Sequence, residues 1–555
     1  MLLLAGMLMP LQVQAAPTCS ASQSPAWQIC GPLESPNGIS VQPSVIQAND
    51  GTLRMVWTGH PVSNYIIMYA ARNTTGGWNP GSSITTQGGI NQNPSLVQFS
   101  NGTIFMFWAY KAANSRHYQL YYITQDGGLF SKQYIPVPLK SPTTLNDTLP
   151  SAAVGRDGTL WLVWTRDNTT LAGTHVMRQL WYMTSKGSVW STEQPLTSAN
   201  DTSWNFQPSV LVGKDNVVRL TYSRGQSSLG NFQINYLTYN GSVWSAPFQL
   251  SSTTSGDVNP SIMQDRNGTL WVFWAAFVPV GTSSAYVIYQ KSSTNNGATW
   301  PGSETALTGL NCPVSGCVDS EYPAAVQSTS PTDKNIWVFY ATNPVANFNI
   351  WALETTTSIS PVHDVAISYF SPNVSQVYQG GFHEPYTASG VPIIQSAVVQ
   401  VLVVIQNVGD FNENVTIRLK ATNTTNYDLG VQIMQTFAGT SSIAYFYFNT
   451  TNVKPARYGI WGNASIPVET LGNRQDGLWS SPNLVHVLPL GDVDQNGSVT
   501  ITDVTVIFYN YGFTCYTPAT CSPRFINAMW GDVNGNGIID INDAGVVAHN
   551  YGTYT

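Results

Sequence analysis

Two stretches near the C-terminus carry oxygen-bearing residues at the spacing of a calcium-binding loop. Positions 1, 3, 5, 7 and 12 are Asp492, Asp494, Asn496, Ser498 and Asp503 in the first stretch, and Asp532, Asn534, Asn536, Ile538 and Asp543 in the second. Calcium takes six to eight hard oxygen ligands, and such a loop supplies side chains, a backbone carbonyl at position 7 and a carboxylate at position 12. A glycine at position 6 permits the sharp turn in both stretches. The sequence therefore predicts two calcium ions as cofactors.

Each loop is followed by a short predicted helix, Val504–Tyr511 in the first half and Ala544–Tyr551 in the second. Position 12 is aspartate rather than the glutamate of an EF-hand. Two such loops with one helix each resemble a type I dockerin, over about residues 489–555. The resemblance implies a calcium-dependent protein partner of the cohesin type. Ile501-Thr502 and Ile541-Asn542 replace the Ser/Thr pairs frequent beside dockerin loops, so the partner stays open, and a calcium-stabilised module without a cohesin is the alternative.

The first 358 residues contain an internal repeat. Each copy begins at a Pro-(Ser/Ala)-apolar motif, and the prolines of the six copies are Pro43, Pro94, Pro150, Pro208, Pro260 and Pro323. In the first five copies an Asn or Asp turn follows seven residues later and an aromatic residue fourteen residues later, as at Asp157 and Trp164; in the sixth, Tyr340 follows a three-residue insertion. Four short strands per copy predict a six-bladed β-propeller.

The sixth copy lacks a fourth strand that begins at tryptophan. The missing segment is found at the N-terminus, where Trp27 and Leu33 have the same six-residue spacing as Trp190 and Leu196 of the third copy. We therefore predict that residues 25–34 supply the outer strand of the last blade and close the ring, which removes an exposed sheet edge. An independent N-terminal strand is the alternative.

One turn of the fifth copy carries a family resemblance. Ser293-Thr-Asn-Asn-Gly-Ala-Thr-Trp300 resembles the Asp-box of sialidases, with Asn295 in the place of the aspartate. The resemblance covers about residues 25–358 and implies a sialidase-like propeller. Because the box is a turn on an outer hairpin, it indicates the fold and does not indicate an activity.

The sialidase resemblance also suggests residues to examine for catalysis. That family uses three arginines, a Tyr/Glu nucleophile pair and an aspartate acid/base, although its Arg-Ile-Pro signature is absent here. The candidates of matching type are Arg166, Arg224, Glu321, Tyr322 and Asp201. Three functions stay open. The leading hypothesis is a funnel that recognises a glycan or another surface ligand; the others are an O-glycosyl hydrolase with two carboxylates, sialidase-like or otherwise, acting in polysaccharide degradation, and a purely structural or adhesion component.

Between the repeat and the loops, residues 361–488 show short alternating strands with turn signals. Predicted strands include Asp364–Phe370, Ala397–Gln406 and Asn414–Leu419. This pattern is typical of an immunoglobulin-like β-sandwich. Val401–Ile417 resembles the cell-adhesion-related Ig-like domain of prokaryotic surface proteins, which implies a spacer between working domains.

The N-terminus and the cysteines predict an exported protein. Residues 1–16 combine an apolar run with a small-residue cleavage pattern, as in a signal peptide. No later stretch approaches the length of a membrane span. Six cysteines fall into three close pairs, which in an exported chain predict disulfides: Cys19/Cys30, Cys312/Cys317 and Cys515/Cys521. The expected location is extracellular, either secreted or associated with a cell surface.

Composition narrows the classes further. The chain has 555 residues and a formal net charge of −7, and only 9% of its residues are charged. A weakly acidic, charge-poor chain disfavours a nucleic-acid binder, and 12% aromatic residues disfavour disorder. The predicted fold class is mainly β and multidomain, with a propeller at 17–358, a sandwich at 361–488 and a small helical calcium module at 489–555.

Overall fold

The chain divides into two compact units, Met1–Ser360 and Pro361–Thr555. The computed structural model describes the residues outside the following positions: 1–17, 34–37, 61–63, 73–75, 80, 86–87, 100, 126–136, 139–144, 156, 169–176, 187–188, 199–200, 227–229, 253–255, 281–282, 311, 313–316, 329–333, 345–346, 357–362, 379–390, 395–397, 408, 410, 439, 468–477, 495, 513–532, 534–537 and 555. The predicted signal peptide lies outside the described residues.

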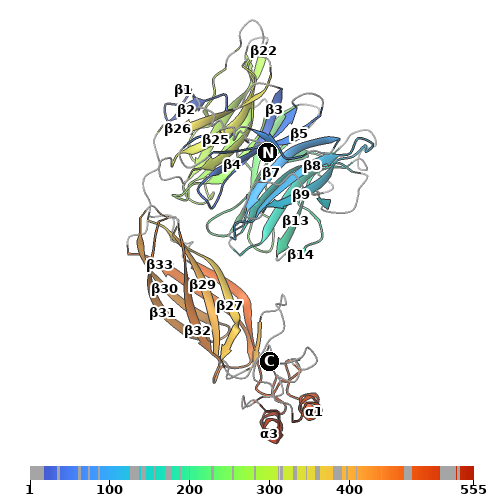
Figure 1. Cartoon of the computed structure of the whole chain (residues 1–555). Coiled ribbons are helices and arrows are strands. Elements are labelled where there is room, and N and C mark those ends of the chain that lie inside the picture. The colour runs from blue at the N-terminus through green and yellow to red at the C-terminus, as the bar shows by residue number, and fades with distance from the viewer. Residues whose placement is uncertain are drawn as a thin grey trace, which may run out of the picture. The chain divides into compact units, whose positions relative to one another are not determined.

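The first unit has a propeller fold, as the repeat predicts. In its described residues, six antiparallel sheets follow one another along the sequence (Figure 1). The first three contain β3 (Ile39–Gln47), β4 (Leu53–His60), β5 (Ile66–Arg72) and β6 (Ser82–Ser83); β7 (Ile90–Gln98), β8 (Ile104–Lys111), β9 (Gln119–Gln125) and β10 (Val137–Pro138); and β11 (Asp147–Val154), β12 (Leu160–Asn168), β13 (Met177–Lys186), β14 (Val189–Trp190) and β15 (Gln194–Pro195).

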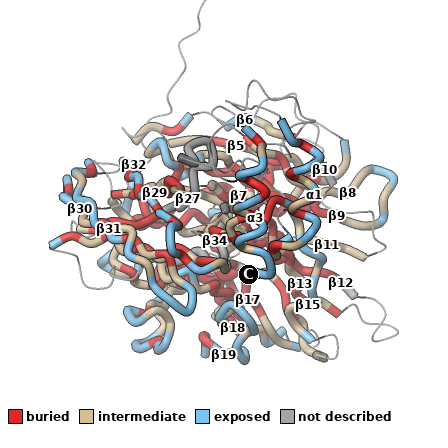
Figure 2. Tube along the Cα trace, turned by 90° about the horizontal axis from the view of Figure 1, so that it is seen from below, coloured by how far each residue is buried: buried red, intermediate tan, exposed pale blue. Residues whose placement is uncertain are grey.

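The next two sheets repeat the pattern, and the last recruits the N-terminus. They contain β16 (Trp204–Val212), β17 (Val218–Gln226), β18 (Asn231–Tyr239) and β19 (Phe248–Gln249); β20 (Asp257–Gln264), β21 (Leu270–Val280), β22 (Ser283–Ser293) and β23 (Thr305–Ala306); and β24 (Ser320–Gln327), β25 (Ile336–Thr342), β26 (Asn349–Thr355), β2 (Trp27–Cys30) and β1 (Cys19–Ala21). The central strand β17 is largely buried and the outer strand β19 exposed (Figure 2).

The N-terminal strand completes the last sheet. β2 pairs antiparallel with β26, with Trp27 opposite Thr355 and Cys30 opposite Ala352. The Trp27 side chain is buried, and its ring meets Phe273 of the fifth sheet edge-on at 5.7 Å. This is the pairing that the Trp27/Leu33 spacing predicts, and it joins the two ends of the repeat array.

The first strands of the six sheets contact one another in a closed cycle, β3–β7–β11–β16–β20–β24–β3. Each has a β-bulge at the motif proline, and the residue before that proline has a φ between 53° and 57°. These residues and their prolines line an axial channel of about 110 Å³. A left-handed residue directly before proline is strained, so the ring of bulges is held by its surroundings.

In the first five copies, the serine after the motif proline connects its sheet to the next one by a hydrogen bond. Its hydroxyl accepts a hydrogen bond from a backbone amide of the following sheet, in the pairs Leu96 N–Ser44 (3.0 Å), Ala152 N–Ser95 (3.1 Å), Val210 N–Ser151 (3.0 Å), Ile262 N–Ser209 (3.1 Å) and Ala325 N–Ser261 (3.1 Å). The sixth copy has Ala324 at this position, so it offers no hydroxyl to the first sheet. The Pro-Ser motif thus provides a hydrogen bond between neighbouring sheets, which we call the inter-sheet fastener.

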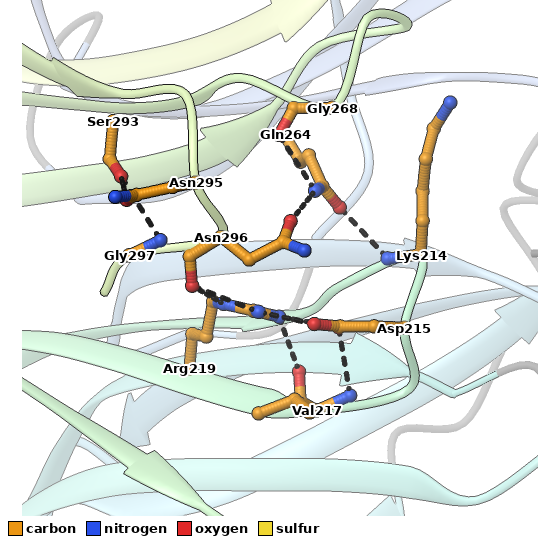
Figure 3. Close-up of polar contacts among 10 residues, drawn as sticks. All are labelled: Lys214, Asp215, Val217, Arg219, Gln264, Gly268, Ser293, Asn295, Asn296 and Gly297. Atoms are coloured by element: carbon orange, nitrogen blue, oxygen red, sulfur yellow. Dashed lines mark hydrogen bonds and ion pairs between the residues drawn. The ribbon is translucent and has the colours of Figure 1, made fainter. Parts of the chain in front are cut away.

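The Asp-box-like turn is also fastened to its neighbour (Figure 3). Gly297 donates its amide to the Ser293 hydroxyl at 3.0 Å, and the same hydroxyl donates to Asn295 Oδ1 at 2.9 Å. Arg219 of the fourth sheet, paired with Asp215 at 2.5 Å, donates to the Asn296 carbonyl at 3.1 Å. These hydrogen bonds hold the turn together and attach it to the fourth sheet, which agrees with a structural role.

In the described residues, the second unit contains two sheets that share one core. Their strands are β27 (Val365–Tyr378), β29 (Val398–Asn407) and β32 (Ser441–Asn449); and β28 (Val391–Ile394), β34 (Leu478–Leu488), β33 (Ala456–Ser465), β30 (Glu413–Thr422) and β31 (Asn426–Thr436). Buried residues of both sheets, such as Val403 and Ile417, belong to one cluster. A separate small cluster around Val499 and Val547 supports the helical segment, although both clusters lie in one compact unit.

Two helices follow, α1 (Ile501–Tyr509) and α3 (Ile541–His549), and both begin three residues earlier than we expect from the sequence. The cause is a capping box in each: Thr500 and Asp503 cap α1, and Asp540 and Asp543 cap α3. Such a box satisfies amides that the first helical turn leaves without partners. Neither described helix has the length and apolar composition needed to cross a membrane.

Candidate functional site

A cleft of about 610 Å³ opens in the first unit where the third to sixth sheets meet. Its walls are rich in aromatic rings: Trp204, Phe206, Phe232, Phe277, Tyr286 and Tyr322. Gln207, Asn259 and Tyr322 line both this cleft and the axial channel, so the cleft opens onto the channel mouth. A concave, mainly apolar site with a few polar groups is the usual form of a small-ligand pocket.

The β-bulges explain how neighbouring residues reach the same cleft. In a regular strand, consecutive side chains point to opposite faces. The register of β24 shifts between Glu321 and Ala324, and both Glu321 and Tyr322 line the cleft. The same shift in β16 places both Phe206 and Gln207 there. A bulge re-aims side chains in this way, so each first strand can present two consecutive residues.

Glu321 is the carboxylate of the cleft. Burial, with a smaller contribution from the charge of Asp319, raises the pKa of Glu321 to about 7. Asp319 is itself held by the Tyr286 amide, which donates to Asp319 Oδ1 at 2.9 Å. Burial and the charge of Glu321 also raise the pKa of the Tyr322 phenol above its ordinary value. At neutral pH this cleft therefore holds a carboxyl group near its midpoint beside a protonated phenol.

The aromatic walls are packed against one another. Trp204 and Phe232 are stacked with centroids 6.3 Å apart, and Phe206 meets Phe232 edge-on at 5.0 Å. On the fifth sheet, Phe277 meets Tyr286 at 5.2 Å. Rings fixed in this way present defined apolar faces to a ligand.

Arg178 of β13 lies at the edge of these rings. Its guanidinium carbon is 4.4 Å from the Trp204 ring centre, and its Nε is 3.5 Å from Asp167 Oδ1. Arg178 is the single cationic side chain among the described residues that line the cleft.

Two of the five candidates chosen from the sequence, Glu321 and Tyr322, lie together in the cleft. Asp201 and Arg224 form an ion pair of 3.2 Å and do not line it. Although burial acts against it, hydrogen bonds from Ser203 and Asn205 and the charge of Arg224 keep the pKa of Asp201 below its ordinary value.

Arg166, the fifth candidate, is buried in a network of its own. It binds Asp147 at 2.6 Å and Glu193 at 2.8 Å, and its guanidinium lies 4.4 Å from the Trp181 ring centre. It does not line the cleft.

Apart from Tyr322, the aromatic residues of the walls were not predicted from the sequence, and neither was Arg178. A usable signal existed, because Glu321 stands two residues before its motif proline and Phe206 has the same offset from Pro208. Reading that offset in every copy would have selected Phe206 and also Val258, which stands two residues before Pro260 and lines the cleft. Phe277, Tyr286 and Arg178 come from the second and third strands, whose length varies between copies, so no fixed offset identifies them.

The first acidic loop gathers three carboxylates. Oxygens of Asp492, Asp494 and Asp503 all lie within 4.8 Å of one another. Asp492 is fully buried; its Oδ2 accepts from the Gly497 amide at 2.9 Å, and its Oδ1 is buried without a hydrogen-bond partner in the described part of the chain. Burial and the charges of Asp503 and Asp494 raise the pKa of Asp492 to about 7. An orphaned buried oxygen among carboxylates fits a hard cation.

The aspartate at position 12 of this loop accepts hydrogen bonds from three backbone amides. Asp503 Oδ1 accepts from the amides of Val493 (2.6 Å) and Asp494 (3.0 Å), and its Oδ2 accepts from the Thr500 amide (2.7 Å). The same carboxylate thus caps α1 and faces the other two aspartates.

In the second loop, Ile538 and Asp543 are described, and the Asp540 amide donates to Asp543 Oδ2 at 2.8 Å. Asp532, Asn534 and Asn536 lie outside the described residues.

Two backbone hydrogen bonds join the two loop–helix halves of this segment, one in each direction. The Gly512 amide donates to the Ile539 carbonyl, and the Gly552 amide to that of Val499.

Two of the three predicted disulfides are present, Cys19–Cys30 and Cys312–Cys317. The first joins β1 to β2 at the outer edge of the closing sheet. Cys515 and Cys521 lie outside the described residues.

No protein-family model matches the sequence, and no curated protein matches it. Similar solved structures include a protein of unknown function from Dyadobacter fermentans (TM-score 0.46, 17% identity, covering 58% of this chain and 96% of that one) and the Hadza microbial sialidase Hz136 (0.41, 15%, 57% and 65%). An α-L-arabinofuranosidase of Fusarium graminearum is similar at a TM-score of 0.44 and 14% identity, covering 61% of this chain and 98% of that one. Identities this low carry no residue roles from those proteins to this chain.

Proposed function

We propose that the chain is an exported, modular protein whose six-bladed propeller binds and cleaves a glycan in the cleft. The observation that carries this proposal is the placement of Glu321 and Tyr322 side by side in a cleft walled by aromatic rings. Ring faces suit the apolar faces of sugars, and a carboxyl group with a pKa near 7 is suited to donate a proton at neutral pH. Glu321 is the general acid in this proposal: it protonates the oxygen of the glycosidic bond that breaks, and a water molecule from the solvent adds to the anomeric carbon that this oxygen leaves.

A second function, recognition without cleavage, is favoured by one observation. Glu321 is the only carboxylate among the described residues that line the cleft. Glycoside hydrolysis usually requires two carboxylates across the scissile bond. In this alternative the aromatic walls bind the glycan and Glu321 accepts its hydroxyl hydrogen bonds.

Product release separates the two functions. The full-length protein is incubated with a broad panel of glycans, freed sugar is measured directly, and binding to the same panel is measured by calorimetry. Release that Glu321→Gln abolishes supports hydrolysis. Binding with no release across the panel supports recognition, and the absence of both contradicts a glycan function.

For the second unit we propose an Ig-like spacer followed by a dockerin-like module that binds two calcium ions. The ligands in the first loop are Asp492, Asp494, Asn496, Ser498 and Asp503. By the loop pattern, those in the second loop are Asp532, Asn534, Asn536, Ile538 and Asp543. Calcium would neutralise the clustered carboxylates and satisfy the orphaned oxygen of Asp492.

The module would then dock the chain to a cohesin-type partner outside the cell. Large apolar side chains such as Ile501, Tyr509 and Ile541, each at least 60% exposed, would form part of that contact. Binding of the full-length protein to a panel of cohesin modules, with and without EGTA, tests the docking. Cohesin binding lost in EGTA supports it, and no binding in calcium contradicts it.

A further inference from the structure

We infer that the cleft selects uncharged glycans over glycans that carry carboxylate or sulfate groups. This inference rests on the proposed glycan function of the cleft and concerns the class of sugar that it takes. It follows from the charges around the cleft rather than from its shape.

The arginines at this end of the propeller already have carboxylate partners. Arg178 contacts Asp167 at 3.5 Å and lies over the Trp204 ring. The two other arginines considered from the sequence, Arg166 and Arg224, are held by Asp147 and Asp201 respectively. The nearby Asp167 charge offsets that of Arg178, so an acidic sugar gains less from this guanidinium than it would from an arginine without a carboxylate partner.

Above about pH 7, where Glu321 has lost its proton, the charge that remains is negative. Glu321 lines the cleft, and Asp319 is close enough for its charge to raise the pKa of Glu321. No described residue of the cleft lining other than Arg178 carries a positive charge to offset them. A ligand carboxylate or sulfate would therefore meet like charge in a partly desolvated site, where repulsion is poorly screened.

The remaining polar groups are neutral. Gln207 and Asn259 stand where the cleft opens onto the channel; the Gln207 side-chain amide donates to Asn259 Oδ1, and Gln207 Oε1 accepts from the Ser223 hydroxyl at 3.0 Å and from the Asn259 backbone amide at 3.0 Å. Amide groups exchange hydrogen bonds with hydroxyls and carry no charge. The cleft thus combines ring faces with uncharged polar groups, which offer an acidic sugar no compensating positive charge.

The test uses pairs of ligands that differ only in charge. Uronic-acid oligosaccharides and the same oligosaccharides after carboxyl reduction, together with a set of neutral oligosaccharides, are titrated calorimetrically into full-length Glu321→Gln at low and high salt. The wild-type protein is titrated at pH 8, where Glu321 carries its charge, with product release measured in parallel.

We expect neutral ligands to bind wild type at least about tenfold more tightly than their acidic counterparts, since one repulsive contact of this kind amounts to roughly that factor. In Glu321→Gln, which lacks this charge, the preference should shrink, and in both proteins the binding of neutral ligands should not change with salt. Acidic ligands that bind as tightly as neutral ones, or more tightly, overturn the inference and leave the glycan function standing. If no glycan of either kind binds or is cleaved, the proposed function itself fails.

A variant that removes the carboxylate beside Arg178 tests the role of charge directly. Asp167→Asn releases Arg178 from its partner without altering a residue that lines the cleft. It should improve binding of acidic ligands by about tenfold and leave neutral binding unchanged. Asp157→Asn, which removes a surface ion pair with Lys186, is the matched control and should change neither. Equal effects of the two variants would contradict the role assigned to Asp167.

Discussion

The acidic loop and the propeller cleft bring chemical groups together by opposite routes. Asp492, Asp494 and Asp503 lie within twelve positions of one another, and the turn that gathers them is local. The cleft takes Arg178 from the third sheet and Glu321 from the sixth, 143 positions apart in the sequence. Its geometry therefore depends on closure of the whole ring. A local site should be sensitive to its own ligands, whereas an assembled site should also be sensitive to distant packing.

The largest expected effect is on the local site. In EGTA, the amides of α1 and α3 should lose protection from hydrogen exchange in the intact protein, while β17 keeps its protection. Without a cation the clustered carboxylates repel one another, and calcium at a thousand times its Kd would contribute about 4 kcal/mol to folding of the segment.

Asp492→Ala should produce the same loss of protection with calcium present. Thr505→Ala, on the exposed surface of α1, is the control and should leave protection intact. Helices that stay protected in EGTA would contradict the coupling of calcium to folding.

The next effect concerns the chemistry of the cleft. Glu321→Gln should slow glycan cleavage by about 10²–10⁴-fold, the usual contribution of a general acid. Because burial raises the pKa of Glu321 to about 7, wild-type activity should fall as pH rises through that value. Glu304→Gln, outside the cleft, is the control. Activity that instead rises through pH 7 would exclude Glu321 as the proton donor.

The same pKa shift affects stability. Between the ordinary pKa of glutamate and about 7, the folded state binds more protons than the unfolded state, so this contribution to stability falls as pH rises. Glu321→Gln should remove that slope from the unfolding free energy of the first unit.

Disrupting the closure of the propeller ring should affect the cleft and leave the acidic loop unchanged. Trp27→Ala should destabilise the first unit by about 3–5 kcal/mol, the cost of truncating a buried aromatic side chain, and should also weaken ligand binding in the cleft. Chemical denaturation followed by tryptophan fluorescence measures the first effect. Val243→Ala, at an exposed position, should change neither quantity. Calcium binding should be unchanged in both variants; a Trp27→Ala protein of wild-type stability would show that the N-terminal strand does not close the ring.

The smallest effect concerns the fasteners between sheets. Ser151→Ala removes the acceptor of the Val210 amide and should cost about 1 kcal/mol. Ala324→Ser supplies a hydroxyl at the seam between the last and first sheets and should act in the opposite direction by a smaller amount. Thermal unfolding compares the two. A change of the same sign in both variants would contradict the fastener role.

Much of the fold follows from local patterns. Turn dipeptides and apolar strands recur at fixed offsets from the motif prolines, so the propeller and its closure by Trp27 could be predicted. Helix starts could not be placed correctly because the position-12 aspartates cap the helices, which the calcium pattern alone does not reveal. The spacing of the two nearby cysteine pairs that are described likewise anticipated both disulfides.

The two candidate sites also differ in how much of each could be predicted from local sequence patterns. The sequence by itself determined which residues can serve as ligands in the acidic loop, because a short loop fixes its own geometry. Only the tertiary structure decided that Glu321 and Tyr322 face aromatic rings of two other sheets, while Arg166 and Arg224 are already occupied by carboxylates. The physical reason is that a residue's partners across a closed ring depend on the packing of all the sheets. The β-bulges, by turning two consecutive side chains into one cleft, break the alternation on which strand patterns rely.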